Sequence, residues 1–492
     1  MEISMARHAR QSASGRQAPG QGTTHPATGR RADLDFMRSF VVVGLVLFHS
    51  AMVFAPGASW FVKNPQTSVG FAAFLLWGSL WGMPLLFAVS GMGARYALRN
   101  RPAGAFVRER LARLLVPFLT CLVLLVPPMF YAARLVQPGF HEAYWRFWAD
   151  FMNVPTLATG LLQHNSWTYA GNEFDPAHLW FLYVLLVFSL MLLPLLLFLR
   201  GPRGAHFLEL LAHFVERRPL VAVATAALPV MVVEAVFGPD VNTGGWERLT
   251  YVFPFLYGFL LASDARIAGA LQRTRWPALT CAVTTSAALL GWAGMLTAHG
   301  AGIPTGWGAL QGLAGWAWLA TILGFAGSLT ARRKAAPAPA GSLPAPAVAP
   351  WRHRAAWYAN QAVLPFYLLH EPVIVAAAWF ITRWQAPIPV KYLALVTVSL
   401  ATTLALYELL VRRFRVPRLL LGMKPPPLRA APSTTLLRRW VVSRSRSHRV
   451  TTSGSWTTTS RFLPGRPFTT RSGSSATATS ANWFSPSANV PR

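Results

Sequence analysis

Long apolar stretches recur along this chain, and they constrain its fold more than any other feature of the sequence. Ten of them have about the length, near 20 residues of helix, that is needed to cross a bilayer. Hydrophobic residues make up 53% of the chain and charged residues 12%, whereas soluble domains carry about 25% charged residues. The sequence therefore predicts an all-α polytopic membrane protein with about ten transmembrane helices. They lie near residues 36–55, 70–92, 111–132, 178–199, 219–238, 246–262, 276–298, 307–329, 361–381 and 391–411.

Basic residues in the predicted loops indicate the orientation of the chain. The formal net charge is +29, and the cytoplasmic loops of membrane proteins carry an excess of Lys and Arg. With a cytoplasmic N-terminus, the internal cytoplasmic loops contain 17 basic residues and the external loops contain 4. This distribution predicts that both termini are cytoplasmic. The positive charge then follows from topology, so we expect contact with membrane lipids and no nucleic-acid partner.

Composition divides the chain into three predicted regions. Residues 1–33 are polar and rich in Gly, Ser, Thr and Arg, and we expect a disordered cytoplasmic leader there. Residues 34–424 contain the apolar stretches and form the predicted membrane domain. Residues 425–492 contain ten Arg but no Lys, Asp or Glu, which is typical of a disordered basic tail. Cys121 and Cys281 both lie in apolar runs, so neither a disulfide framework nor a metal site is expected.

The first apolar stretch contains three ionisable side chains, which are costly inside a bilayer and mark candidate functional sites. At about 100° per residue, Asp35, Arg38 and His49 share one helix face, with Arg38 and His49 roughly 16 Å apart along the axis. In the predicted orientation His49 lies in the outer half of the bilayer, where it either hydrogen-bonds between helices or carries out proton chemistry. Arg38 either extends to the cytoplasmic surface beside Asp35 or takes part in that chemistry. We interpret His49, Arg38 and Asp35 as catalytic residues.

Two later stretches place histidines beside a carboxylate or an aromatic ring. His370 and Glu371 are followed by Pro372, which lacks an N–H and therefore frees a backbone carbonyl near residue 368. The polar pair either stabilises a kink or lines a cavity. His178 and Trp180 open the fourth stretch on the predicted outer side, where an acceptor would enter. We interpret His178, Trp180, His370 and Glu371 as substrate-binding residues.

Arg110 and Arg113 lie three positions apart at the predicted cytoplasmic end of the third stretch. Residues at this spacing are neighbours on a helix face, and a pair of guanidinium groups suits phosphate. The pair either belongs to the positive-inside distribution or binds the phosphates of a donor substrate.

Several common motifs of catalysis and nucleotide binding are absent from the sequence. It contains no GxxxxGK[ST], HExxH or GxSxG, so ATP-driven export, metalloprotease and serine-hydrolase activities lack support. A proton-coupled transporter or flippase of a glycan or lipid-linked precursor is the alternative, with His49, His370 and Glu234 as a proton relay. It would predict inverted repeats, and the two halves share no matching pair of motifs.

Five segments, taken in order, resemble a known family. They are LDFMRSFVVVGLVLFH, PLLFAVSG, RERLARLLVP, HLWFLYVL and PFYLLHEPVIV, within about residues 31–424. The chain resembles the multi-pass acyltransferase family 3, whose members O-acylate cell-envelope polysaccharides and glycolipids. The segment FPFLYGFLLASDARI adds a resemblance to glucan-modifying, succinyltransferase-like members.

The resemblance implies a ten-helix core in the inner (plasma) membrane and an acyl-CoA donor, acetyl-CoA or succinyl-CoA, on the cytoplasmic side, with no permanently bound cofactor. It implies essential roles for Arg38 and His49, and contacts of Arg110 and Arg113 with the CoA phosphates. The expected acceptor is a hydroxyl of an envelope polysaccharide or glycolipid, with His49 as general base or as covalent acyl carrier. Some members carry an additional extracytoplasmic domain, which is not recognised here. A second transfer step would therefore require a separate extracytoplasmic partner.

Overall fold

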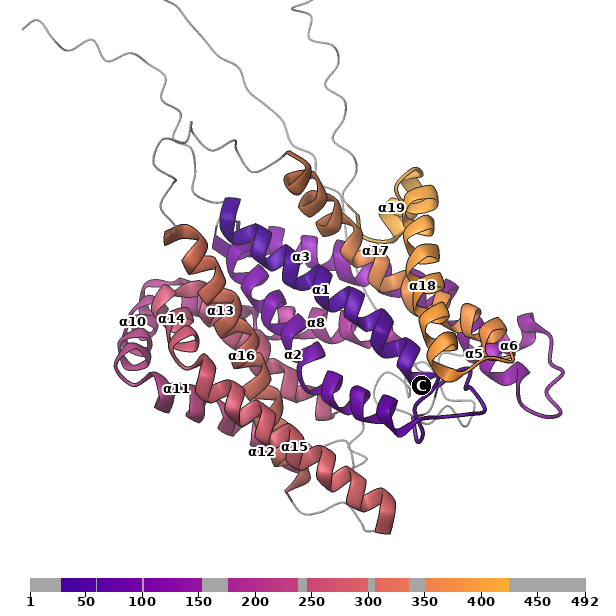
Figure 1. Cartoon of the computed structure of the whole chain (residues 1–492). Coiled ribbons are helices and arrows are strands. Elements are labelled where there is room, and N and C mark those ends of the chain that lie inside the picture. The colour runs from indigo at the N-terminus through magenta and orange to yellow at the C-terminus, as the bar shows by residue number, and fades with distance from the viewer. Residues whose placement is uncertain are drawn as a thin grey trace, which may run out of the picture. The chain divides into compact units, whose positions relative to one another are not determined.

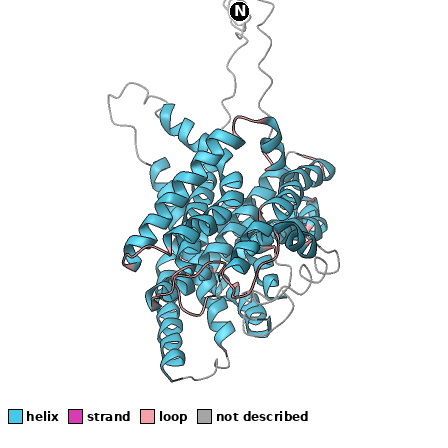
Figure 2. Ribbon diagram, turned by 90° about the vertical axis from the view of Figure 1, so that its right-hand side faces the viewer, coloured by secondary structure: helices cyan, strands magenta, loops and turns pink. Residues whose placement is uncertain are grey.

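The computed structural model describes residues 28–58, 60–99, 101–152, 176–237, 246–299, 306–335 and 350–423. The predicted tail and most of the predicted leader lie outside these ranges. Within them the chain forms helices and loops and contains no β-strand (Figure 2). The all-α class predicted from the apolar stretches is therefore confirmed.

The first part of the fold comprises α1 (Thr28–Met52), α2 (Val69–Arg99), α3 (Ala103–Arg110), the π-helix η1 (Leu111–Leu115), α4 (Val116–Leu124), α5 (Val126–Leu135) and α6 (Tyr144–Phe151). The middle part comprises η2 (Ala177–Leu179), α8 (Trp180–Met191), α9 (Leu193–Arg200), α10 (Pro202–Arg217), α11 (Pro219–Thr225), α12 (Ala227–Phe237), η3 (Trp246–Tyr251), α13 (Val252–Ser263) and α14 (Ala265–Arg273). The last part comprises α15 (Arg275–His299), α16 (Trp307–Ala335), α17 (Pro350–Ile381), α18 (Ile388–Leu406), the π-helix η4 (Tyr407–Val411) and α19 (Arg415–Leu420).

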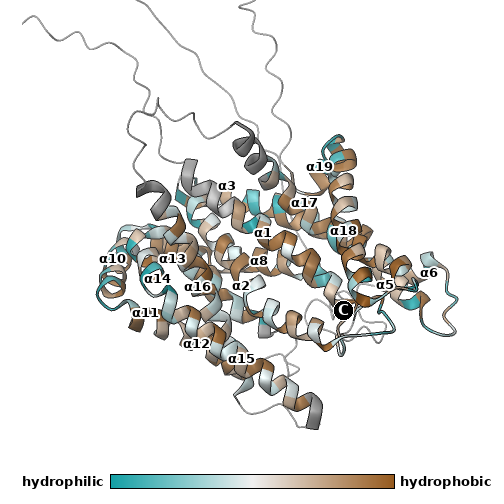
Figure 3. Cartoon of the chain, viewed as in Figure 1, coloured by the Kyte–Doolittle hydropathy of each residue, from teal (hydrophilic) through white to brown (hydrophobic). Residues whose placement is uncertain are grey.

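Every one of the ten predicted apolar stretches contains helix, and seven spans among the described residues are long and apolar enough to cross a membrane. An eighth is formed if α8 and α9, which are bent by 51° at their junction, count as one span. The other two are shorter: the apolar part of α1 is Phe36–Met52, and α13 has 12 residues. The long helices are coloured hydrophobic over most of their length in Figure 3. The protein is thus a multi-span membrane protein, and the total of ten spans stays a prediction.

Helix α1 has two opposite faces and packs against α2, α17 and α18 (Figure 1). One face carries four exposed, large apolar side chains, which are Phe36, Phe40, Val43 and Leu47. Their spacing of three or four residues forms a single stripe suited to lipid. At about 100° per residue, Arg38 and His49 lie roughly opposite this stripe. Both residues therefore point into the helical bundle, as the helix phase predicted.

Helices α2 and α13 pack with their backbones in contact. A Cβ atom at Gly91 of α2 would lie 1.9 Å from the carbonyl oxygen of Phe255, and a Cβ at Gly258 of α13 would lie 1.9 Å from that of Ala88. Only glycine fits at both positions, and small residues of this kind let membrane helices approach closely. This contact holds the short α13 against α2, the helix that also supports α1.

An ion-pair cluster joins α10 to α14 outside the membrane-spanning segments. Arg266 donates hydrogen bonds to Asp264 and to both carboxylate oxygens of Glu209. These bonds hold the pKa values of both carboxyl groups below their usual range. The two short helices are therefore tied together at the hydrophilic region that Figure 3 shows around α10 and α14.

Candidate active site

Three histidines and one glutamate meet inside the bundle, and we call them the histidine cluster: His49 of α1, His178 of η2, and His370 and Glu371 of α17. His49 Nδ1 lies 2.9 Å from His370 Nε2 and 3.7 Å from Glu371 Oε2. His178 Nδ1 lies 3.1 Å from the same Glu371 oxygen. The structure thus brings together one residue predicted to be catalytic and three predicted to bind substrate, from segments far apart in the sequence.

The hydrogen bonds of this cluster assign the tautomers of two neutral imidazoles. His370 Nδ1 lies 2.5 Å from the carbonyl oxygen of Tyr367, which can only accept, so this nitrogen carries the proton. His370 Nε2 is then an acceptor, and His49 Nδ1 donates to it. His49 Nε2 is left with a lone pair. The side chain of His49 is 14% exposed, against 2% for Glu371, so His49 is the member that a substrate can reach.

Pro372 explains how His178 is held. A residue at position 372 with an N–H would bond to the carbonyl of Leu368, but proline has none. His178 Nε2 instead donates to this oxygen at 3.2 Å, which confirms the prediction of a free carbonyl near residue 368. His178 Nδ1 then faces Glu371 Oε2 at 3.1 Å, which is an ion-pair distance, but it does not form a hydrogen bond. The Tyr367 hydroxyl also donates to the backbone carbonyl of His178.

Trp60 is part of the site although the sequence did not single it out. Its ring stacks on the His49 imidazole with centroids 5.4 Å apart and planes 28° apart. Trp60 is itself buried and lies in the loop between α1 and α2. A loop residue has no helical phase from which its direction could be predicted. Only its position five residues after the end of the first predicted apolar stretch and its aromatic type gave any signal.

Arg38 lies nearer the N-terminal end of α1 and points at α2. Its Nη2 donates to the carbonyl of Val89 at 3.4 Å, and a Cβ at Gly93 would lie only 2.6 Å from the same nitrogen. Gly93 therefore makes room for the guanidinium group. Arg38 also lies within electrostatic range of Arg110. The side chain of Asp35, the third predicted catalytic residue, falls outside the described residues.

The spacing of Arg110 and Arg113 around the helix departs from that of a regular α-helix. The chain passes from α3 into the π-helix η1 directly after Arg110, and the wider π-turn changes the direction of the residues that follow. Arg110 packs its guanidinium over the Phe106 ring at 4.9 Å, whereas Arg113 is exposed and lies 3.7 Å from Glu109. The charges of both arginines still act on each other, and with Arg38 they form a basic cluster. Their donor-binding role stays a prediction.

Trp180 lies apart from the histidine cluster. Its ring packs against Tyr251 with centroids 5.4 Å apart, and the guanidinium of Arg248 lies 5.2 Å above it. Helix η2 ends at Leu179, and α8 begins with Trp180. The predicted contact of Trp180 with substrate has no geometric support beside the cluster.

The ligand atoms of His49, His370 and Glu371 lie within 4.8 Å of one another, which is close enough to hold a metal ion. In the structure two of these atoms, His49 Nδ1 and His370 Nε2, instead hydrogen-bond to each other. The free Nε2 of His49 can accept a proton or attack a carbonyl carbon. Glu371 is placed to stabilise a positive charge on His49.

A family model described as an acyltransferase domain matches residues 31–408 of the chain, which is well over half of its length. The matched segment includes the histidine cluster and the basic cluster. No curated protein and no solved structure matches the chain.

Proposed function

Because the chain belongs to acyltransferase family 3, we propose that it transfers an acyl group from acyl-CoA in the cytoplasm to a hydroxyl of an envelope glycan or glycolipid at the inner membrane. The protein is a membrane acyltransferase. Its donor, its acceptor and the roles of its residues are proposals. The proposed acyl group is succinyl or acetyl.

The observation that carries the mechanism is the hydrogen-bonded chain that ends at His49 Nε2. A backbone carbonyl fixes the proton on His370, and His370 in turn fixes the proton on His49. The reactive lone pair is thereby oriented before a substrate binds, and such orientation of catalytic groups lowers activation barriers.

In the proposed reaction, His49 Nε2 removes the proton of the acceptor hydroxyl, and the oxygen attacks the thioester carbonyl. The C–O bond forms, the C–S bond breaks, and the proton leaves with the CoA thiolate. In the covalent alternative, His49 Nε2 itself attacks the thioester, the C–S bond breaks, and CoA leaves as a thiolate from an acyl-imidazolium. The acceptor hydroxyl then attacks the acyl carbon, the N–C bond breaks, and the hydroxyl proton passes through His49 to the CoA thiolate. Glu371 stabilises the positive charge on His49 in both routes.

The donor is proposed to bind at the opposite end of α1. Arg38, Arg110 and Arg113 form a basic cluster there, and guanidinium groups bind phosphates well. Arg38 lies about 16 Å from His49 along the helix, so the CoA phosphates and the reacting carbonyl would occupy the two ends of one path along α1.

The test is transfer of labelled acyl groups from acyl-CoA to envelope glycan in membranes containing the His49→Ala variant. The rate should fall by at least about 100-fold, the usual contribution of a positioned base. The control is His141→Ala, an exposed histidine outside the cluster. Full activity of the His49 variant would exclude the mechanism, and glycan uptake without acyl transfer by the unaltered protein would favour the transporter. Acyl label retained on the protein after denaturation would identify the covalent route.

A further inference from the structure

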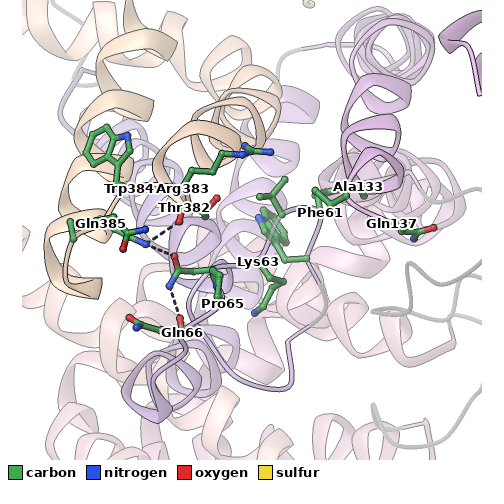
Figure 4. A pocket seen from close by; sticks show the side chains of 16 residues that line it. Phe61, Lys63, Pro65, Gln66, Ala133, Gln137, Thr382, Arg383, Trp384 and Gln385 are labelled. Carbon is green, nitrogen blue, oxygen red and sulfur yellow. Dashed lines mark hydrogen bonds between the residues drawn. The ribbon is translucent and has the colours of Figure 1, made fainter. Parts of the chain in front are cut away.

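A cavity of about 710 Å³ lies beside the loop that follows α1 (Figure 4). Three segments line most of it: the loop after α1, the end of α5, and the turn from α17 into α18. Its volume is within the range of small-molecule binding sites. We call it the Lys63–Lys391 cavity.

The lining of this cavity is positively charged. It includes Lys63, Arg383 and Lys391, and none of its 16 lining residues is a carboxylate. Lys391 is 6% exposed, and its Nζ donates to Asn64 Oδ1 and to the carbonyl of Thr382 at 3.0 Å each. Lys63 Nζ donates to the backbone carbonyl of Met52 at 2.7 Å.

All the acceptors of these two ammonium groups are neutral. Buried charges are normally paired with an opposite charge, but among the described residues neither lysine has a carboxylate partner. Lys391 also lies in the first turns of α18, where the helix dipole is unfavourable for a cation. Within the described residues, the positive charge of the cavity is therefore not neutralised, and an anionic ligand could neutralise it.

Lys63 keeps its charge at neutral pH. Burial lowers its pKa to about 8, which still leaves the amine mostly protonated at pH 7. Arg383 is exposed and rests on the Trp379 ring, with its guanidinium carbon 4.1 Å from the ring centroid. The cavity thus has two cations inside and one at its edge.

The cavity adjoins the proposed reaction site through one side chain. Trp60 lines the cavity and stacks on His49 at 5.4 Å. Phe61 and Trp384 add aromatic surface to the lining, against which the C–H faces of a sugar ring can pack. A saccharide in this cavity would lie one ring away from the imidazole proposed to activate its hydroxyl.

We propose that the Lys63–Lys391 cavity binds the acceptor as an acidic sugar, whose carboxylate or phosphate is held by Lys63, Lys391 and Arg383. This inference rests on the proposed function, since it names the class of acceptor used at the same site. The acceptor is then a charged saccharide, and an uncharged glucan binds weakly.

The experiment measures equilibrium binding to the full-length protein in lipid nanodiscs. The probes are an oligosaccharide of uronic acid, a sugar phosphate, and a neutral glucan oligosaccharide of matched length. At least one acidic probe should bind about tenfold more tightly than the neutral one, as expected for one charge-assisted hydrogen bond. Comparing the two acidic probes tells which group is preferred.

Lys63→Gln should weaken binding of the acidic probe by about tenfold, and Lys63→Arg should restore it. Arg146→Gln removes an exposed charge from α6, outside the lining, and should leave binding unchanged. Equal binding of acidic and neutral probes, or unchanged binding to a folded Lys63→Gln variant, overturns the inference. The transfer assay on His49→Ala tests the proposed function separately, because it reports acyl transfer and not acceptor affinity.

Discussion

Glu371 illustrates how a residue that is costly in a membrane can be stabilised and used. It is 2% exposed, yet its Oε2 lies 3.1 Å from His178 and 3.7 Å from His49. His178 lies on the buried side of this carboxylate, and His49 approaches it from the accessible side. A positive charge that develops on His49 during the reaction would therefore be met by a carboxylate already in place.

We expect Glu371→Gln to lower the turnover rate of acyl transfer by about 100-fold, because the neutral amide cannot stabilise a positive charge on His49. The amide has nearly the same shape, so the acceptor KM should change little. The measurement is kcat and KM with labelled acyl-CoA. Glu234→Gln, which alters a carboxyl group in another span, is the matched control. If Glu371→Gln kept the turnover rate of the Glu234→Gln control, Glu371 would have only a packing role.

At the residue scale, the sequence predicted on which face of its own helix a side chain lies. It did not predict which side chains of different helices contact each other. The phase of α1 predicted that Arg38 and His49 point the same way, and Pro372 predicted the free carbonyl that His178 binds. The contact of His49 with His370 joins positions 321 residues apart, which no local pattern encodes. Lys63 was visible only as a loop charge. Its role depends on how the loop after α1 packs.

At the scale of secondary-structure elements, the backbone contact of α2 with α13 is the feature that holds a short helix in the bundle. The short α13 has 12 residues, or about 18 Å of helix. This is less than the roughly 30 Å of hydrocarbon core. Its place in the bundle therefore depends on close packing, and Gly91 and Gly258 permit that packing.

Two glycines of α2 provide a test with opposite signs. Gly91→Ala should lower the stability by about 2 kcal/mol, because its Cβ would collide with the carbonyl of Phe255. Gly82→Ala should raise the stability by about 0.5–1 kcal/mol, because its Cβ meets open space and alanine favours helix. Unfolding of both variants in detergent micelles measures the difference. Destabilisation of the same size in both would mean that the α2–α13 contact is not special.

The apolar stretches predicted where helices form but not how they are interrupted. Pro194 removes an N–H near the junction of α8 and α9, where the span bends by 51°. The π-helix after Arg110 leaves no comparable mark in the sequence, and it alters the relation between Arg110 and Arg113. A prediction that assumes a regular α-helix therefore does not describe how Arg110 and Arg113 are oriented relative to each other.

At the scale of the whole molecule, the two proposed binding sites, which are the basic cluster and the Lys63–Lys391 cavity, lie at opposite ends of α1. The predicted topology puts the basic cluster in the cytoplasm and the Lys63–Lys391 cavity outside. To test it, single cysteines are introduced after Cys121 and Cys281 are replaced by serine. In intact spheroplasts a membrane-impermeant maleimide should label Thr67→Cys but not Arg203→Cys, both of which are exposed positions. Labelling of Arg203→Cys alone would reverse the orientation and with it the assignment of donor and acceptor sides.

The hydrogen-bonded chain that starts at His49 ends on the carbonyl of Tyr367. A carbonyl has no proton to release, so a proton that enters at His49 Nε2 cannot leave through His370 and Tyr367. This series of hydrogen bonds therefore does not conduct protons across the bilayer. An enzyme that works in this way moves no net charge along these residues. In the proposed reaction, the free energy comes from breaking the thioester and not from the membrane potential.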